Sequence, residues 1–498
     1  MSGAGTAPAT SPSRLPWVVA VIAAALLVGG LWRGSHANGD EVIYLQMARE
    51  MARSGELLDL QWMGEVAPQR PPLAIWLLAT AEVAAPGSLM AQRMPSMLMG
   101  ALCLLLTFLL GRRLTGCART AALGVLLLLA ANTFYHNARS PMTDTTALAG
   151  ILAALYAWLR ARERPGWTLA AGASLGWVLM TKHALVVIPL GIMAVDLLQD
   201  RRWAALRTRG PWLGAAAALG VAGPWHLIQT LRHGAGFWRE YLGFNVAGRM
   251  TESLYVAEDP LYYGRHLVET EGLLALVLGV GLGAVVWAWA RRREHDARFL
   301  VLWFVVAFLP FQLSATRLPH YLLPALVPAS LAAARLLRPL LGRPLVVVAA
   351  VLAALTLFFQ ASAYDLLQAD FTPDQRSFAA AIRDRGAPAA QVVAFNVYEL
   401  ALFHDLDRPV RMLTDDDGFF GAVDAEPILH RAGAVTRIPR GPQRGLFDDG
   451  PVHCITRLED LPFFCGPGDV ACGSGGLTVE RGLRHALVSN ALRPREAP

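Results

Sequence analysis

Long apolar runs separated by short arginine-rich loops recur through most of this chain and constrain its fold more than any other feature. A membrane-spanning helix needs about 20 mainly apolar residues. The predicted spans are residues 16–32, 90–110, 120–135, 143–159, 167–181, 183–199, 211–230, 271–290, 299–315, 318–337 and 345–362. Only 16% of the residues are charged and 54% are hydrophobic, whereas soluble domains carry about a quarter charged residues. We therefore expect a polytopic α-helical membrane protein with about 11 to 13 transmembrane helices.

The arginines predict the orientation of these spans. If the loops alternate between the two sides of the membrane, one side receives only arginine-rich segments, namely the N-terminus and residues 111–120, 160–166, 200–210, 291–298 and 335–344. The positive-inside rule makes this side cytoplasmic. The net charge of +6 is spread through these loops, so membrane topology explains it and no nucleic-acid partner is expected. The opposite side receives two long outer loops, 33–89 and 231–270, and the C-terminal region.

The C-terminal region differs in character from the rest of the chain. Its apolar runs shorten and its content of proline, glycine and charge rises, which predicts a transmembrane domain over 1–362 and a soluble extracytoplasmic α/β domain over 363–498. A capping box beginning at Thr372 predicts a helix to about Gly386, and residues 391–395 and 409–413 read as strands. Three cysteines, Cys454, Cys465 and Cys472, could supply one disulfide, with the pairing left open.

Asp40 and Glu41 form an acidic pair a few residues beyond the first predicted span. Carboxylates are unfavourable near the hydrocarbon of a bilayer, so such a pair indicates a functional site. The alternative is a solvated loop in which the two charges have no special role.

Two basic residues on the same predicted side are typical of phosphate binding. Lys182 is the only lysine of the chain, and a compact ammonium pairs well with a phosphate. Its alternative role is an anchor that extends to the membrane surface. Arg70 precedes two prolines that fix an extended backbone, although a turn before a surface helix would give the same pattern.

Further polar residues lie at predicted outer ends of spans. Asp144 either faces a cavity, caps a helix or pairs with Arg139. Asn245 and Arg249 are four residues apart in an aromatic-rich segment, so they would share one helical face; an interfacial helix is the alternative. His320 and Tyr321 open the span at 318–337. The histidines are scattered and lack an i,i+4 pair, so no metal site is predicted.

The order of several motifs resembles the GT-C membrane glycosyltransferases, in particular the lipid A aminoarabinose transferases and the protein mannosyltransferases. The motifs are Gly39-Asp40-Glu41-x-x-Tyr44, Arg70-Pro71-Pro72-Leu73-x-x-Trp76, Gln92-Arg93-Met94-Pro95-Ser96, Asp144, Thr181-Lys182, Pro224-Trp225, Asn245-x-x-x-Arg249 and Leu318-Pro319-x-Tyr321-x-x-Pro324. Each motif is short, but their series over about residues 35–330 is specific.

The resemblance implies a role for each of these positions. It implies catalytic positions at Asp40, Glu41 and Asp144, donor-phosphate binding by Arg70, Lys182, Arg249 and Tyr321, and a substrate pocket containing Tyr44, Asn245 and His320. Two positions depart from the family. Arg70 stands where lysine is usual, and Gln69 stands where the aminoarabinose transferases tend to have glutamate, which weakens any metal role there.

The resemblance implies an enzyme that moves a sugar from a polyprenyl-phosphate-linked donor to an extracytoplasmic acceptor, which could be a lipid A-like glycolipid, a protein or an envelope glycan. It implies a multi-pass protein of the bacterial inner membrane, with a cytoplasmic N-terminus and a periplasmic C-terminal domain. No cofactor is expected, although a divalent metal is left open. The alternatives are a transporter or flippase for a lipid-linked or anionic substrate, and a receptor. Transporters place ionisable residues near the midplane and often contain inverted repeats, neither of which is evident in the sequence.

Overall fold

The computed structural model divides into two compact units, which are described separately below. Unit 1 comprises residues 1–31, 93–226 and 257–367, and unit 2 comprises residues 32–92, 227–256 and 368–498. The structure describes residues 15–36, 39–68, 70–199, 206–251, 259–340, 373–398, 400–416, 435–439, 443–448, 450–465 and 477–493. The predicted span 345–362, the domain boundary near residue 362, and Thr372 and Cys472 lie outside these residues.

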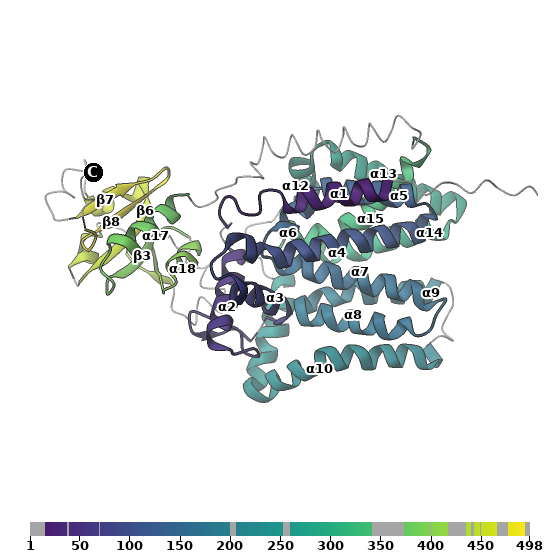
Figure 1. The fold of residues 1–498 in the computed structure, drawn as a ribbon, viewed down its shortest axis with the longest axis horizontal. Helices are drawn as coiled ribbons and strands as arrows, with labels where there is room; N and C mark the ends of the chain where they lie inside the picture. Colours follow the sequence, from purple (N-terminus) through teal and green to yellow (C-terminus); the bar gives the residue numbers. More distant parts are fainter. Residues whose placement is uncertain are drawn as a thin grey trace, which may run out of the picture. The chain divides into compact units, whose positions relative to one another are not determined.

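Unit 1 is built from helices. They are α1 (Leu15–Val28), α4 (Leu89–Thr115), α5 (Ala118–Ala130), α6 (Asn132–Arg139), α7 (Thr143–Ala161), α8 (Trp167–Lys182), η1 (His183–Val186), α9 (Val187–Gln199), α10 (Arg209–Trp238), α12 (Tyr262–Glu271), α13 (Leu273–Arg292), α14 (His295–Leu313), η4 (Pro319–Leu322), α15 (Leu323–Leu336) and η5 (Arg338–Leu340). Helices α4, α7 and α8 run side by side along one direction (Figure 1). α4 begins in unit 2 and continues into unit 1, and α10 runs from unit 1 into unit 2.

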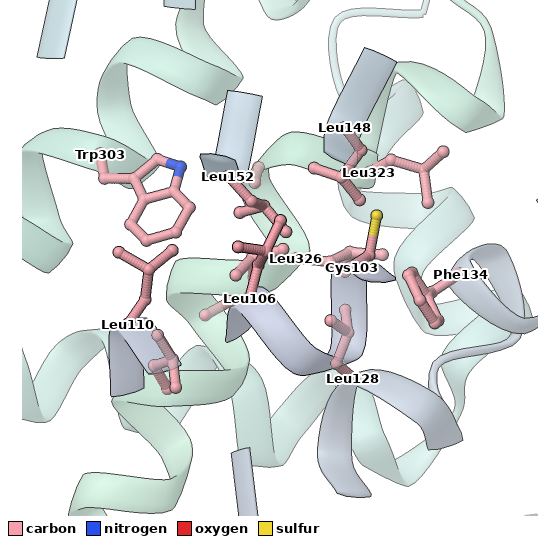
Figure 2. Close-up of a cluster of buried hydrophobic side chains, with 14 of the residues drawn as sticks. Cys103, Leu106, Leu110, Leu128, Phe134, Leu148, Leu152, Trp303, Leu323 and Leu326 are labelled. Atoms are coloured by element: carbon pink, nitrogen blue, oxygen red, sulfur yellow. The ribbon is translucent and has the colours of Figure 1, made fainter. Parts of the chain in front are cut away.

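The core of unit 1 is an apolar cluster to which most of these helices contribute (Figure 2). Cys103 and Leu106 of α4 meet Leu148 and Leu152 of α7, together with Trp303 of α14. The helices also approach each other closely at small residues. A Cβ atom on Gly281 would lie 2.4 Å from the Cα of Ala333, so α13 packs against α15 only because residue 281 is glycine. Close contacts of this kind are typical of helices packed within membranes.

Four helical segments among the described residues are long and apolar enough to cross a membrane: Leu89–Thr115, Trp167–Leu198, Leu273–Arg292 and His295–Leu313. A fifth candidate is the pair α5 and α6, which are bent by 75° relative to each other. The predicted span over 120–135 therefore contains a sharp bend, which the sequence did not indicate. The other predicted spans in the described residues are helical, but each is shorter, less apolar or interrupted.

Unit 2 combines the two long loops with the C-terminal segment. The loops contain α2 (Asp40–Ser54), β1 (Gln61–Trp62), β2 (Glu65–Val66), α3 (Leu73–Ala84), the π-helical η3 (Arg239–Gly248) and α11 (Arg249–Thr251). The C-terminal segment contains α17 (Pro373–Arg385), β3 (Gln391–Phe395), α18 (Ala401–Leu406), β4 (Arg411–Thr414), β5 (Val435–Arg437), η6 (Arg444–Phe447), β6 (Val452–Arg457), η7 (Leu458–Asp460), α21 (Pro462–Cys465), β7 (Thr478–Arg481) and β8 (His485–Ser489).

The C-terminal strands form one mixed sheet in the order β5-β4-β3-β6-β8-β7. The first four strands are parallel, and β8 and β7 extend the sheet in antiparallel fashion. Phe395 of β3 and Cys454 of β6 pack in its apolar core with Phe464 of α21. Cys454 is a buried free thiol, whereas Cys465 forms a disulfide bond.

Helix α2, in the long loop 33–89, is joined to α18 of the C-terminal segment by polar contacts. Asp407 follows α18 and accepts hydrogen bonds from Arg53 at 2.5 Å and from Gln46 at 3.3 Å. Next to them, the rings of Trp62 and Phe403 lie 5.0 Å apart. Residues of this loop and of the C-terminal segment thus build a single interface within unit 2.

Candidate active site

The acidic pair lies in the first turn of α2. Gly39 precedes this helix with φ 97° and ψ −133°, a conformation suited to glycine. Carboxylates are favourable at such a position because the helix dipole is positive at its N-terminus. Asp40 Oδ1 is 3.7 Å from Arg70 Nη1, and the Arg70 guanidinium lies 5.1 Å from the ring centre of Tyr44. The structure therefore brings Asp40, Tyr44 and Arg70 together.

Glu41 points into a different environment from its neighbour Asp40. Its side chain is buried, and its Oε2 is 3.7 Å from Nδ1 of His36, which is also buried. The sequence analysis did not identify His36, because a lone histidine in a loop carries no pattern that separates it from the other histidines of the chain.

Asn245 and Arg249 lie on the π-helical segment η3 and at the start of α11, respectively. Asn245 donates to the carbonyl of Glu240 at 3.4 Å, and the Arg249 guanidinium lies 5.7 Å from the Phe244 ring. The helix here is π-helical rather than α-helical, with hydrogen bonds between residues five apart, and the proposed sharing of one face by Asn245 and Arg249 stays a prediction.

Asp144 lies in the first turn of α7 and is the centre of a second cluster, which belongs to unit 1. Only 3% of its surface is exposed. Lys182 Nζ donates to its Oδ1 at 2.8 Å, and His320 Nε2 is 4.0 Å from the same oxygen. The Lys182 ammonium also lies 5.1 Å from the ring centre of Tyr321. Asp144, Lys182, His320 and Tyr321 are thus brought together.

Local backbone geometry places Lys182 at this position. Helix α8 ends at Lys182, where φ −149° and ψ 82° interrupt the helical path before η1 begins. The two alternatives weighed for Asp144 are wrong. Arg139 contacts Tyr135 and the carbonyl of Gly29 instead, and no side chain caps the start of α7.

A buried carboxylate in unit 1 holds the start of helix α6. Glu271, the last residue of α12, accepts hydrogen bonds from the backbone N–H groups of Asn132 and Thr133 at 2.6 and 3.0 Å, and from the Thr133 hydroxyl at 2.7 Å. It thereby caps α6 at the bend after α5. The sequence analysis missed Glu271, although an acidic residue directly before an apolar run was a visible signal.

Replacing Glu271 by glutamine tests this role. The Glu271→Gln variant is expected to lose about 1–3 kcal/mol of stability, because the new amide would set a donor against the N–H groups at the start of α6. Thermal unfolding of the purified protein measures the loss. Glu269→Gln, an exposed position on the same helix, is the matched control. An equal melting temperature for Glu271→Gln and the parent would contradict the capping role.

The predicted site residues are divided between the two units. Asp40, Glu41, Tyr44, Arg70, Asn245 and Arg249 belong to unit 2, and Asp144, Lys182, His320 and Tyr321 belong to unit 1. Within the described part of the chain, no group of three or more histidine, cysteine, aspartate or glutamate side chains has the geometry to hold a metal ion.

The fold is that of the GT-C membrane glycosyltransferases. The structure of ArnT from Cupriavidus metallidurans bound to undecaprenyl phosphate superposes with a TM-score of 0.73 at 19% sequence identity, covering 97% of this chain and 100% of that one. An oligosaccharyltransferase from Archaeoglobus fulgidus gives a TM-score of 0.51 at 12% identity, covering 90% of this chain and 68% of that one. The chain is therefore a polytopic helical membrane protein.

Sequence comparison finds similarity to enzymes of the same kind. Residues 15–233 match the dolichyl-phosphate-mannose-protein mannosyltransferase family. The undecaprenyl phosphate-α-4-amino-4-deoxy-L-arabinose arabinosyl transferase of Pseudomonas aeruginosa strain LESB58 is 30% identical over 312 residues. That match covers 61% of this chain but only 55% of the relative, so the chain spans about half the length of the curated relatives it matches. The predicted resemblance to the GT-C membrane glycosyltransferases is confirmed.

Proposed function

We propose that this chain transfers a sugar from a polyprenyl-phosphate-linked donor to an acceptor on the non-cytoplasmic face of the membrane. The observation that carries the proposal is the pairing of carboxylates with cations: Asp40 with Arg70, and Asp144 with Lys182. The fold and the arabinosyl transferase relatives support the same activity, and they favour it over a transporter or flippase.

The pairs fit the charge changes of such a transfer. The bond between the anomeric carbon and the phosphate oxygen breaks, and its electron pair remains on the leaving phosphate. Arg70, Lys182 and Arg249 would stabilise this developing charge, where electrostatic stabilisation is most effective. With a hydroxyl acceptor, the new bond forms from the acceptor oxygen, whose proton passes to a carboxylate, and we assign this role to Asp40. A phosphate acceptor would need no base, and Asp40 would then orient it.

We assign no step to a metal or another cofactor. We assign Glu41 to the reaction centre next to Asp40, Tyr321 to donor-phosphate binding, and Tyr44, Asn245 and His320 to substrate binding. The acceptor would be a lipid A-like glycolipid, a protein or an envelope glycan.

Incorporation of a labelled sugar tests the function. The full chain is reconstituted in vesicles with a radiolabelled polyprenyl-phosphate sugar and envelope extract. It is expected to transfer the label to the acceptor fraction. The Asp40→Asn variant is expected to transfer none. Movement of the labelled lipid across the vesicle membrane without sugar transfer would instead identify a flippase.

We also propose that the protein crosses the bacterial inner membrane about 11 to 13 times, with its N-terminus in the cytoplasm and the C-terminal segment outside. The distribution of arginines supports this orientation. Arg113 and Arg160, in the loops assigned to the cytoplasm, both pair with Glu163.

Labelling of introduced cysteines tests the orientation. Leu483, in the C-terminal segment, is 78% exposed, whereas the native Cys454 is buried and would not report. In spheroplasts of a strain carrying Leu483→Cys, an impermeant maleimide is expected to label residue 483. It should label Arg164→Cys, in an exposed position of the 160–166 loop, only after lysis. The reverse pattern would invert the topology.

A further inference from the structure

A continuous chain of polar side chains inside unit 2 leads to Glu41. It begins at Glu82 of α3, passes through Gln92 in the first turn of α4 and reaches His36, which precedes α2. Gln92 Nε2 donates to Glu82 Oε2 at 3.1 Å, and His36 Nε2 is 2.8 Å from Gln92 Oε1. These three side chains are 7%, 3% and 8% exposed, in that order. Buried polar chains of this kind fix the orientation of each member.

The hydrogen-bond partners of His36 determine which of its two ring nitrogens bears a hydrogen. A carboxylate only accepts, so the Gln92 amide nitrogen must face Glu82 and its carbonyl oxygen must face His36. A carbonyl oxygen also only accepts, so His36 Nε2 carries a proton and donates it. The other ring nitrogen, Nδ1, therefore faces Glu41 Oε2 at 3.7 Å.

Arg49 contacts Glu82, which lies at the end of this row of polar side chains farthest from Glu41. Its Nε lies 3.5 Å from Glu82 Oε1, while its other nitrogens donate to the carbonyl oxygen of His404 at 2.6 Å and to His404 Nε2 at 3.0 Å. Because a guanidinium can only donate, His404 Nε2 accepts and this ring is neutral. In agreement, burial lowers the pKa of His404 well below its usual value, with smaller contributions from Arg49 and His36.

We propose that His36 is a positioning residue that keeps Glu41 ionised beside Asp40, and that Gln92, Glu82 and Arg49 hold the His36 ring in the orientation this requires. Glu41 is only 5% exposed, and a carboxylate in such surroundings needs a nearby cation to stay charged. The His36 ring is the basic side chain that the structure places next to it, with Nδ1 at 3.7 Å from Glu41 Oε2. The assignment of a role to Glu41 rests on the proposed function, whereas the pairing of Glu41 with His36 does not.

The other ionisable groups around His36 come from the C-terminal segment. The rings of His36 and His404 lie 6.0 Å apart. Asp405 of α18, whose pKa is raised by burial, interacts electrostatically with His36 and with Arg376, which itself donates to the carbonyl of Gly34. Glu41 is the only carboxylate within ion-pair distance of His36 in the described residues.

Carbodiimide labelling tests the pairing without depending on activity. Dicyclohexylcarbodiimide reacts with protonated carboxylic acids in apolar surroundings, and mass spectrometry of the full-length protein in membranes gives the extent of modification at Glu41. Loss of the imidazole in His36→Gln is expected to raise that modification at pH 7 by roughly threefold or more. Gln92→Leu keeps the imidazole but removes the acceptor for Nε2–H, so a smaller rise is expected.

His485→Gln is the matched control, because His485 also pairs with a carboxylate in unit 2, at 3.2 Å from Asp374, but lies outside the chain that leads to Glu41. It should leave Glu41 modification unchanged. A second readout is the pH profile of sugar transfer, whose acidic limb is expected to move up by about one pH unit in His36→Gln and not in His485→Gln.

Equal Glu41 modification in the parent, His36→Gln and Gln92→Leu would overturn the inference. If His36→Gln does not fold, Gln92→Leu alone decides the matter. If the parent transfers no sugar while Glu41 modification rises in His36→Gln, the proposed function fails but the pairing of His36 with Glu41 stands.

Discussion

The Asp40→Asn variant is expected to lower the rate of sugar transfer by about 10²–10⁴-fold, which is the usual contribution of a group that takes a proton in the transition state. The substitution removes one charge at nearly constant shape, and Asp40 is partly exposed beside Arg70, so the fold should persist. The measurement is the initial rate of label transfer at saturating donor, with folding checked by gel filtration.

Arg70→Gln provides a contrast at the other end of the same ion pair. It should raise the KM for the lipid-linked donor, because Arg70 is assigned to the donor phosphate, whereas Asp40→Asn should mainly lower kcat. Asp384→Asn, an exposed carboxylate on α17, is the neutral control. Turnover close to that of the parent in Asp40→Asn would remove Asp40 from the reaction.

Lys182→Ala is expected to have two separate effects. It leaves Asp144, which is 3% exposed, without the partner at 2.8 Å, and loss of one partner of a buried pair destabilises proteins by about 3–5 kcal/mol. It should also weaken binding of the donor phosphate. Lys182→Arg should retain much of the stability but lose about 1–3 kcal/mol of donor affinity, because a planar guanidinium does not reproduce a point-charge contact.

A double variant separates these two effects. Lys182→Ala combined with Asp144→Ala removes the unpaired carboxylate, so the melting temperature should recover relative to Lys182→Ala alone. Donor affinity, measured with purified polyprenyl phosphate, should not recover. If affinity returns together with stability, or if Lys182→Arg binds donor like the parent, Lys182 has a structural role only.

The helices were largely predictable because a helix buried in a membrane requires a continuous run of apolar residues, which is visible in the sequence. The predicted span over 271–290 agrees with α13 at Leu273–Arg292, and the bounds predicted for 143–159 agree with helix α7 at Thr143–Ala161, although α7 is not among the helices apolar enough to cross a membrane. The 75° bend between α5 and α6 was not predictable from such a run, since the apolar composition continues across it. The carboxylate that caps α6 at the bend, Glu271, is 139 residues from Asn132 in the sequence.

The site was predictable as a set of residues but not as a set of contacts. The motif order singled out Asp144 and Lys182, yet their direct ion pair across 38 residues was not anticipated, and Arg139 was considered as the partner instead. His36 escaped detection because its role depends on Gln92, 56 residues away. A sequence records which polar residues lie near a membrane surface, whereas their pairing depends on how the helices pack.

The contacts between α2 and the C-terminal segment have a consequence for the biogenesis of the protein. Arg49 and His404 are 355 residues apart, and nearly all of the helices of unit 1 are synthesised between them. Domains fold in the order in which they emerge from the ribosome, and contacts between distant residues form slowly. The loop 33–89 therefore emerges early but reaches its final structure only when the end of the chain has been made. A chain that terminates before residue 401 would insert its helices and still leave Arg49 without its partner His404. The contact between α2 and the C-terminal segment is therefore the part of the structure that a nascent protein completes last.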